Sequence, residues 1–361
     1  MRALILVLAL ILPAIARAEI VLTDAAGREV RLDRPARNIA TNDSLLLLSL
    51  ALLEPDPVAT VAGWGGPQRL DAGLKAAVRA RFPAVDDVPE IAGVTPASTS
   101  VEPIIAAAPD LFVVTLWDPG WQPLAERLEA AGIPVLFLEN SEDHRIDRVT
   151  SSARALHLLG RAMGREDRAD AFADFASARM EAIRQAVPPD APRPKVLVEG
   201  HAAGPCCAVP GRDNMLAQMV ALAGGESFGS GGIAGYDGRV APETLMIDGP
   251  AIYVATGGAH LAGAGGFVIG AGIPPQDAQQ SLEQVLAGSI RRNIPAVAEG
   301  RAHGVSHQLS ISALNVVVTE CLARWIHPEI FAHLDPQDTL DRINTDFLAV
   351  PLSGSFCIDA P

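Results

Sequence analysis

The sequence predicts an α/β protein with two Rossmann-like lobes, each a parallel sheet covered by helices, joined by a long rigid α-helix. Short apolar segments alternate with amphipathic helical segments in two separate series, and this alternation favours parallel sheets. Between the series, residues 144–187 carry apolar side chains at helical spacing. We therefore expect an N-terminal lobe at 19–143, an interdomain backbone helix at 144–187 and a C-terminal lobe at 188–361.

The first eighteen residues have the order of a secretory signal peptide. Arg2 supplies a positive charge, residues 3–16 are apolar, and Ala16 and Ala18 are the small residues of a cleavage site. The apolar segment is too short to span a bilayer, and no cysteine stands near the cleavage point to carry a lipid. We expect a soluble periplasmic protein that begins near Glu19 and has no lipid anchor.

The length and net charge of the chain exclude some classes of function. Removal of residues 1–18 leaves 343 residues, which is long for one core and suits two. The formal charge of −14 becomes −16 when Arg2 and Arg17 are removed. Such an acidic chain is a poor ligand for nucleic acid or for an anionic lipid surface. We expect a monomer with no intrinsic cofactor.

The first lobe begins with a hairpin at residues 20–32, where alternating apolar residues flank an Ala-Gly turn. Its sheet is predicted from four apolar segments, which are residues 38–41, 58–62, 111–115 and 135–138. The helices between them are predicted at residues 45–53, 68–80, 101–107 and 121–131. In such a sheet, ligands meet the loops beyond the carboxyl ends of the strands.

Residues 144–186 predict either one rod of roughly 60 Å or two helices with a bend near Gly164. A proline cluster at 188–194 ends this segment. The second lobe then predicts strands at residues 195–199, 251–255 and 302–305, and helices at 214–223, 282–287 and 311–325.

Several stretches, in the right order, resemble one family. They are "DAAGREVRLDRPARNIA", "TSVEPIIAAAPDLFVV", "LAERLEAAGIPVLFLE", "LGRAMGREDRADAF", "VAPETLMIDGPAIYVATGG" and "RWIHPEIFAHLDPQDTL" followed by "FLAVPLSGSF". Together they resemble the periplasmic substrate-binding proteins of ABC importers for iron complexes and cobalamin, whose lobes are joined by a rigid helix. The resemblance covers nearly all of residues 20–356. It implies a binding protein that is not an enzyme and that delivers its ligand to an ABC permease at the inner membrane.

Two glutamates occupy matching positions in the two lobes. Glu102 lies in "SVEPIIAAAPD" and Glu243 in "APETLMIDGPA". The resemblance implies that they dock the permease, since two separated carboxylates on a rigid body fix an orientation. The alternative is that each is an acid in the first turn of a helix, where it stabilises the helix dipole.

Cleft candidates in the first lobe follow its predicted strands. They are Asn42, Trp64, Trp117 and Trp121. Tryptophan suits a flat or apolar ligand and can orient a polar edge with its indole N–H. The alternative is that one or two of the tryptophans cap the core of the lobe.

The loop at residues 199–214 carries His201, Cys206 and Cys207. We rank a disulfide first, since the compartment is oxidising. Cys206 or Cys207 would pair with Cys321 or Cys357, and a bridge between the vicinal cysteines themselves would be strained. Two unpaired thiols rank second, and ligation of a transition metal ranks third.

The remaining ligand candidates in the second lobe are Tyr236, Arg239, His260 and His307. The haem-binding relatives implied by the resemblance use a tyrosine on iron, so Tyr236 joins His201 as a candidate metal ligand. The alternative for Tyr236 is a solvated loop residue. Arg239 could meet a carboxylate or hydroxamate oxygen. A lone histidine is usually an ordinary polar residue, and His307, at a strand-to-helix turn, is the best placed of them.

No nucleophile elbow, HExxH, phosphate-binding loop or paired-carboxylate motif occurs in the sequence. We expect the binding component of an ABC importer for an iron-containing or corrinoid ligand, with a ferric siderophore first, haem second and cobalamin third. The alternative of another class is a periplasmic thiol or metal-handling enzyme that uses Cys206, Cys207 and His201.

Overall fold

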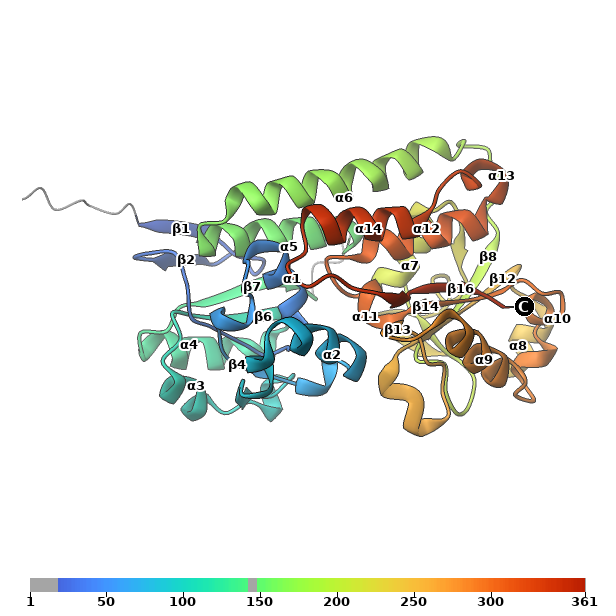
Figure 1. The fold of residues 1–361 in the computed structure, drawn as a ribbon. Coiled ribbons are helices and arrows are strands. Elements are labelled where there is room, and N and C mark those ends of the chain that lie inside the picture. The colour runs from blue at the N-terminus through green and yellow to red at the C-terminus, as the bar shows by residue number, and fades with distance from the viewer. Residues whose placement is uncertain (1–18, 142–147, 361) are drawn as a thin grey trace, which may run out of the picture.

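The computed structural model describes residues 19–141 and 148–360. The signal peptide expected at 1–18 and the start of the expected helix at 144–147 lie outside these residues. Within the described ranges, no helix is long and apolar enough to cross a membrane. Figure 1 shows two lobes side by side, with helices running along one flank of both.

The N-terminal lobe is built on five parallel strands in the order β5-β4-β3-β6-β7. The strands are β3 (Ile39–Thr41), β4 (Val61–Gly65), β5 (Glu90–Ala92), β6 (Leu111–Trp117) and β7 (Val135–Asn140). Helices α1 (Leu46–Leu53), α2 (Ala72–Arg81), α3 (Val101–Ala107) and α4 (Gln122–Ala130) connect them, and the hairpin β1 (Ile20–Thr23) and β2 (Glu29–Leu32) precedes them. Chain order therefore reverses between β3 and β6. In doubly wound sheets this reversal is where a ligand crevice opens.

The C-terminal lobe has a second sheet in the order β10-β8-β12-β14-β16. Its strands are β8 (Lys195–Glu199), β10 (Glu226–Ser227), β12 (Ile252–Gly257), β14 (Ala302–Ser306) and β16 (Cys357–Asp359), and only β16 pairs antiparallel. The chain order here reverses between β8 and β12, which is the second place where a crevice can form. The main helices are α7 (Met215–Leu222), α8 (Pro242–Ile247), α9 (Pro275–Leu286), α11 (His307–Ser310), α12 (Asn315–Ile326) and α14 (Pro336–Asp346).

Two short ribbons complete the C-terminal lobe. They are β9 (Ala208–Pro210) with β11 (Asp237–Arg239), and β13 (Gly270–Ala271) with β15 (Gly354–Ser355). Neither ribbon was predicted, because two or three residues carry no readable alternation. The loop before β13 is anchored by Phe267, which is fully buried.

The predicted helical segment is a hairpin of two helices and not one rod. α5 (Arg148–Met163) and α6 (Glu166–Ala186) lie against each other, and His157 Nδ1 of α5 is 2.7 Å from Asp170 Oδ1 of α6. Gly164 has φ = +61°, a conformation that favours glycine, and forms the turn between them. α6 alone runs along both lobes (Figure 1), and its 21 residues span about 31 Å.

α6 is fixed to both lobes by polar contacts. Arg168 Nε donates to Leu52 O in α1 at 3.0 Å, and Arg179 Nε donates to Glu320 Oε1 in α12 at 2.6 Å. The largest apolar core is also continuous across the molecule, since it joins buried residues of α1, α6 and α12. The lobes are therefore held by a shared core and would move as rigid bodies with small amplitude.

Candidate functional site

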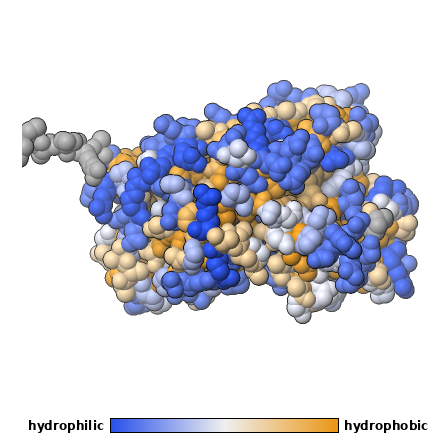
Figure 2. All heavy atoms as spheres, in the orientation of Figure 1, coloured by the Kyte–Doolittle hydropathy of each residue, from blue (hydrophilic) through white to orange (hydrophobic). Residues whose placement is uncertain are grey.

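A cleft lies between the lobes and is lined by residues of both. Its cavity has a volume of about 410 Å³. In Figure 2 the outline of the molecule is indented between the lobes on the side opposite α6. Apolar walls come from Leu46, Leu116 and Leu138 on one side and from Met215 and Ile311 on the other. The cleft thus suits a ligand with an apolar periphery.

Three neighbouring strands of the C-terminal lobe each place a histidine just beyond their carboxyl ends. His201 follows β8, His260 follows β12 and His307 follows β14. Because these strands are parallel and adjacent, their carboxyl ends share one sheet edge. The first two flank the point where the chain order reverses. Sequence reasoning had selected each histidine singly, and the structure brings all three together.

The imidazoles form a chain of contacts. His201 Nδ1 is 3.0 Å from His260 Nε2, and His260 Nδ1 is 3.0 Å from Gln308 Nε2. The rings of His201 and His307 are 3.9 Å apart between centroids. His201 and His307 line the cleft, while His260 reaches it through His201.

The backbone of His201 is held in an unusual conformation. Its φ is +49°, one of two positive values at non-glycine residues among those described. Such strain costs on the order of 1–2 kcal/mol and persists only where surrounding contacts impose it. Here the His201 N–H donates to Thr256 Oγ1 at 2.8 Å, and the next residue pairs with β12. The loop therefore presents this imidazole in one position.

The surroundings of all three imidazoles favour their neutral form. Burial lowers the pKa of His201, His260 and His307, and the lowering is greatest for His307. Repulsion from His260 and Arg69 adds to the effect of burial on the pKa of His201, whereas Asp71 partly opposes it at His260. Neutral imidazoles have free nitrogen lone pairs, which transition metals bind.

The N-terminal lobe faces this cluster with charged groups. Arg69 Nε donates to Asp43 Oδ2 at 2.8 Å, and both residues line the cleft. Asn42, the predicted ligand residue, is instead structural: it is buried, and its side chain bonds Val94 O and the Thr115 N–H. The predicted loop therefore reaches the cleft through the next residue, Asp43, and not through Asn42.

Beneath the His201 loop lies a buried ionic network that the sequence did not suggest. Glu199, the last residue of β8, accepts two bonds from Arg291, at 2.9 and 2.6 Å, and one from the Tyr253 hydroxyl at 2.5 Å. Arg291 Nη2 also donates to Ala203 O at 3.4 Å. Burial and the adjacent carboxylate raise the pKa of Tyr253 well above its usual value. The network fixes the strand end from which His201 follows.

Two of the three tryptophans predicted to line the cleft lie in the core instead. Trp64 and Trp121 are each 2 % exposed and belong to the cores of the N-terminal lobe. Trp121 packs against Phe112 with ring centroids 6.4 Å apart. Both residues therefore fulfil the alternative role of core side chains. The side chain of Trp117, at the end of β6, lies outside the described residues.

Tyr236 lines the cleft and is 48 % exposed. Its side chain thus stands at the rim, opposite the apolar wall. Arg239 lies outside the cleft lining, in β11, where it donates to Pro205 O at 2.9 Å. The expectation that Arg239 meets the ligand was therefore wrong in this conformation.

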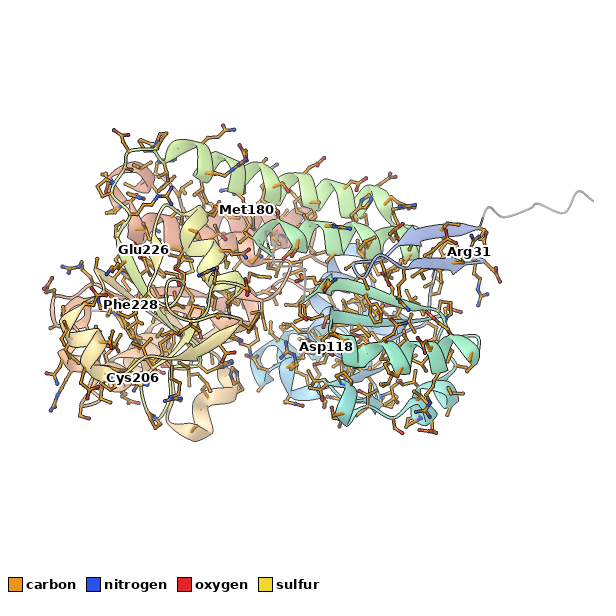
Figure 3. All side chains as sticks on the ribbon, turned by 180° about the vertical axis from the view of Figure 1, so that it is seen from behind. Arg31, Asp118, Met180, Cys206, Glu226 and Phe228 are labelled. Carbon is orange, nitrogen blue, oxygen red and sulfur yellow. A yellow bond between two sulfur atoms is a disulfide. The ribbon has the colours of Figure 1, made fainter. Side chains whose placement is uncertain are left out.

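The cysteines pair differently from the leading prediction. Cys206 bonds Cys207, and Cys321 bonds Cys357, with Cα atoms 6.4 Å apart in the second pair. A bridge between the vicinal cysteines had been kept as a possible but strained alternative. Cys206 lies in the C-terminal lobe on the side away from Met180 of α6 (Figure 3). Glu199, Cys206 and Cys207 place potential ligand atoms within 4.8 Å, but the disulfide and Arg291 already engage all three.

The two candidate docking glutamates are exposed in the first turns of α3 and α8. Glu102 accepts hydrogen bonds from the Ser100 hydroxyl and from Arg127, and these contacts lower its pKa. Each residue has an exposed aliphatic neighbour on the same helix, Ile105 at 40 % and Ile247 at 87 % exposure.

The chain is similar in sequence and in fold to known proteins. A family model described as periplasmic binding protein matches residues 50–304. Among solved structures, the TroA-like periplasmic binding protein FepB from Veillonella parvula is similar with a TM-score of 0.83 and 21 % identity, over 95 % of this chain and 100 % of that one.

Two further structures are similar in fold. CeuE from Helicobacter pylori, solved as a Ni-His complex, has a TM-score of 0.67 and 14 % identity, covering 93 % of this chain and 97 % of that one. The periplasmic heme-binding protein RhuT from Roseiflexus sp. RS-1 has a TM-score of 0.56 and 16 % identity, covering 82 % and 98 %. No curated protein matches the sequence.

Proposed function

The chain belongs to the periplasmic binding protein family of ABC transporters, and within it we propose that the chain captures an iron complex between its lobes through the cleft histidines. The complex is a ferric siderophore that leaves coordination positions on iron open, and haem is the second candidate. The chain then delivers the complex to a membrane permease.

The observation that carries the proposal is the cluster of three imidazoles at the edge of an apolar-walled cleft, where burial lowers the pKa of each and so favours a free nitrogen lone pair. Imidazole nitrogen is a ligand for iron. A chelate that already fills all six positions on iron would gain nothing from these groups. The site therefore favours a complex with one or two free positions, into which an imidazole can enter.

Haem is favoured as the second candidate by one feature of the cleft. Leu46, Leu116 and Met215 offer apolar contacts to a flat macrocycle, and Tyr236 at the rim offers a second type of iron ligand. The similar fold of RhuT, a heme-binding protein, is compatible with this candidate. A corrinoid remains the third candidate.

Delivery would use the two exposed glutamates. Glu102 and Glu243 lie on different lobes and would meet basic residues of the permease, which fixes the docking orientation. Arg127 already holds Glu102 at 3.0 Å, so a permease cation would have to replace it or join it. Closure on the ligand would be small, because the lobes share a core.

The experiment is purification of the protein from its own periplasm, followed by a visible spectrum and metal analysis. A ferric charge-transfer band, a Soret band or a corrin spectrum would each identify the complex. The purified chain should then be stripped and titrated with that complex. We expect His201→Ala to weaken binding at least tenfold. His303→Ala is the matched control, because His303 bonds Asp359 and stacks on Trp325 away from the cleft lining.

A protein that carries no iron or cobalt and takes up no ferric chelate, haem or corrinoid at micromolar concentration would contradict the proposal. Equal losses in His201→Ala and His303→Ala would contradict the role of the cluster.

A further inference from the structure

The C-terminal lobe alone carries a set of nitrogen donors that can bind a metal ion without a chelator. We propose that His201 and His260, with His307 as third ligand and Gln308 as the group that orients His260, bind a free divalent first-row transition-metal ion. This inference goes beyond capture of an iron complex, since the ion is bound without an accompanying ligand.

The spacing of two nitrogens carries the first step. His201 Nδ1 and His260 Nε2 are 3.0 Å apart. In a tetrahedral site with metal–nitrogen bonds of about 2.0–2.1 Å, two ligand nitrogens lie about 3.3 Å apart. The two nitrogens therefore need to separate by only a few tenths of an ångström, but each ring must also tilt so that its lone pair points at the ion and no longer at the other ring. Their backbones are held by β8 and β12, which are paired.

The bridging proton between His201 and His260 can give way to the ion without leaving the protein. One N–H of the two histidines makes the hydrogen bond between the rings. When the ion enters, both facing nitrogens must offer lone pairs, so the bridging proton moves to the other nitrogen of its own ring. No proton leaves the protein in this rearrangement.

Gln308 supplies the outer contact that such a site requires. A metal-bound histidine usually donates its second ring N–H to an oxygen acceptor, which fixes its orientation. The Gln308 amide lies 3.0 Å from His260 Nδ1, and its buried Oε1 has no hydrogen-bond partner among the described residues. Rotation of this amide by a half-turn places Oε1 against Nδ1–H, and Nε2 of His260 then faces the ion.

His307 is the third donor. Its Nδ1 is buried and has no hydrogen-bond partner in the part of the chain that the structure describes, and a buried nitrogen without a partner is destabilising. Its ring lies 3.9 Å from that of His201. Among the described residues the ligand atoms of the three histidines do not all lie within 4.8 Å of one another, so the His307 side chain has to rotate before its nitrogen reaches the ion. Three protein ligands leave a fourth position open to the cleft, where water or a ligand atom binds. Imidazole donors suit zinc, nickel, copper and cobalt.

The test is a titration of the chelator-treated chain, without residues 1–18, with Co²⁺ alone, followed by its visible d–d bands. We expect saturable binding of one ion with the band intensity of a tetrahedral or five-coordinate site, and displacement by Zn²⁺. His201→Ala and His260→Ala should each weaken binding at least 100-fold.

Gln308→Leu should weaken Co²⁺ binding about 10–100-fold, whereas Gln308→Glu, which keeps an oxygen acceptor, should retain it. His303→Ala should bind as wild type does. Far-UV circular dichroism and thermal unfolding of each variant show whether it is folded.

Absence of saturable Co²⁺ binding, or equal binding by wild type and His260→Ala, would overturn the inference. Uptake of an iron complex is measured on the same samples. A chain that binds the complex and not Co²⁺ would overturn this inference and leave the proposed function standing. A chain that binds Co²⁺ through these histidines and takes up no complex would support this inference and overturn the proposed function.

Discussion

The buried network below the His201 loop gives the sharpest stability prediction. Arg291→Met would remove both bonds to Glu199, at 2.9 and 2.6 Å, while a side chain of similar length fills the space. The carboxylate of Glu199 is 1 % exposed and would keep only the Tyr253 hydroxyl as a partner. An unpaired charge would then be left in the core of the C-terminal lobe.

Loss of one partner of a buried ion pair costs about 3–5 kcal/mol, chiefly because the remaining charge stays desolvated. The size of the loss thus depends on Glu199 and not on the missing arginine alone. Glu199→Gln combined with Arg291→Met removes both charges and keeps an acceptor for Tyr253. We expect this double variant to recover at least half of the loss.

The assay is urea unfolding at pH 7 of the wild type, the two single variants and the double variant. A coupling of about 2 kcal/mol or more between the two positions would support the argument. If Arg291→Met costs less than about 1 kcal/mol and addition of Glu199→Gln changes nothing, the pair is not a buried charge pair and the reasoning is refuted.

Three further predictions concern other parts of the structure. A Cβ at Gly73 in α2 would lie 2.0 Å from Ala271 O of the other lobe, so Gly73→Ala should separate the lobes, raise the radius of gyration in small-angle scattering and weaken ligand binding. The Cys321–Cys357 disulfide closes a loop of 36 residues, so replacing both cysteines with serine should lower the free energy of unfolding by about 3–4 kcal/mol. Burial raises the pKa of Glu320, so wild-type stability relative to Glu320→Gln should fall as pH rises above the ordinary pKa of a glutamate and through the raised one.

Each of these has a control or a contradicting result. Gly231→Ala meets no atom within 4 Å and should leave scattering unchanged, and an equal radius for both glycine variants would contradict the lobe contact. Equal stability of the reduced and oxidised wild type would contradict the role assigned to the disulfide. For Glu320, the raised folded pKa means that protons favour the folded state, so a difference that grows with pH would have the wrong sign.

The main strands could be predicted because both sheets are built from continuous apolar segments. The apolar residues of β6, β8 and β12 are continuous and lie between turn residues, which identifies buried parallel strands. The two histidines next to β12 and β14 were selected for that reason. Their mutual contacts could not be predicted, because the residue spacing within one strand does not indicate which strands are neighbours in the sheet.

The failures have physical causes as well. The strand predicted at 58–62 is β4 at Val61–Gly65 in the structure, so Trp64, which was expected beyond the strand end, lies within the strand and is buried. Trp121 lies in the turn before α4, where its ring enters the core. For the helical segment, two helices with a bend near Gly164 were one of the two predicted forms, and the structure has this form because the positive φ of Gly164 reverses the chain. The choice between the two forms could not be made beforehand, since apolar periodicity alone is the same for a rod and for a hairpin. Long-range partners such as Glu199 and Arg291 leave no local pattern.

A crystal structure of the loaded protein, with anomalous data collected at the iron edge, tests the account most directly. We expect one iron peak in the cleft within about 2.1 Å of a nitrogen of His201, His260 or His307. An iron complex seated elsewhere, or in the cleft with no imidazole within bonding distance of the metal, would contradict it.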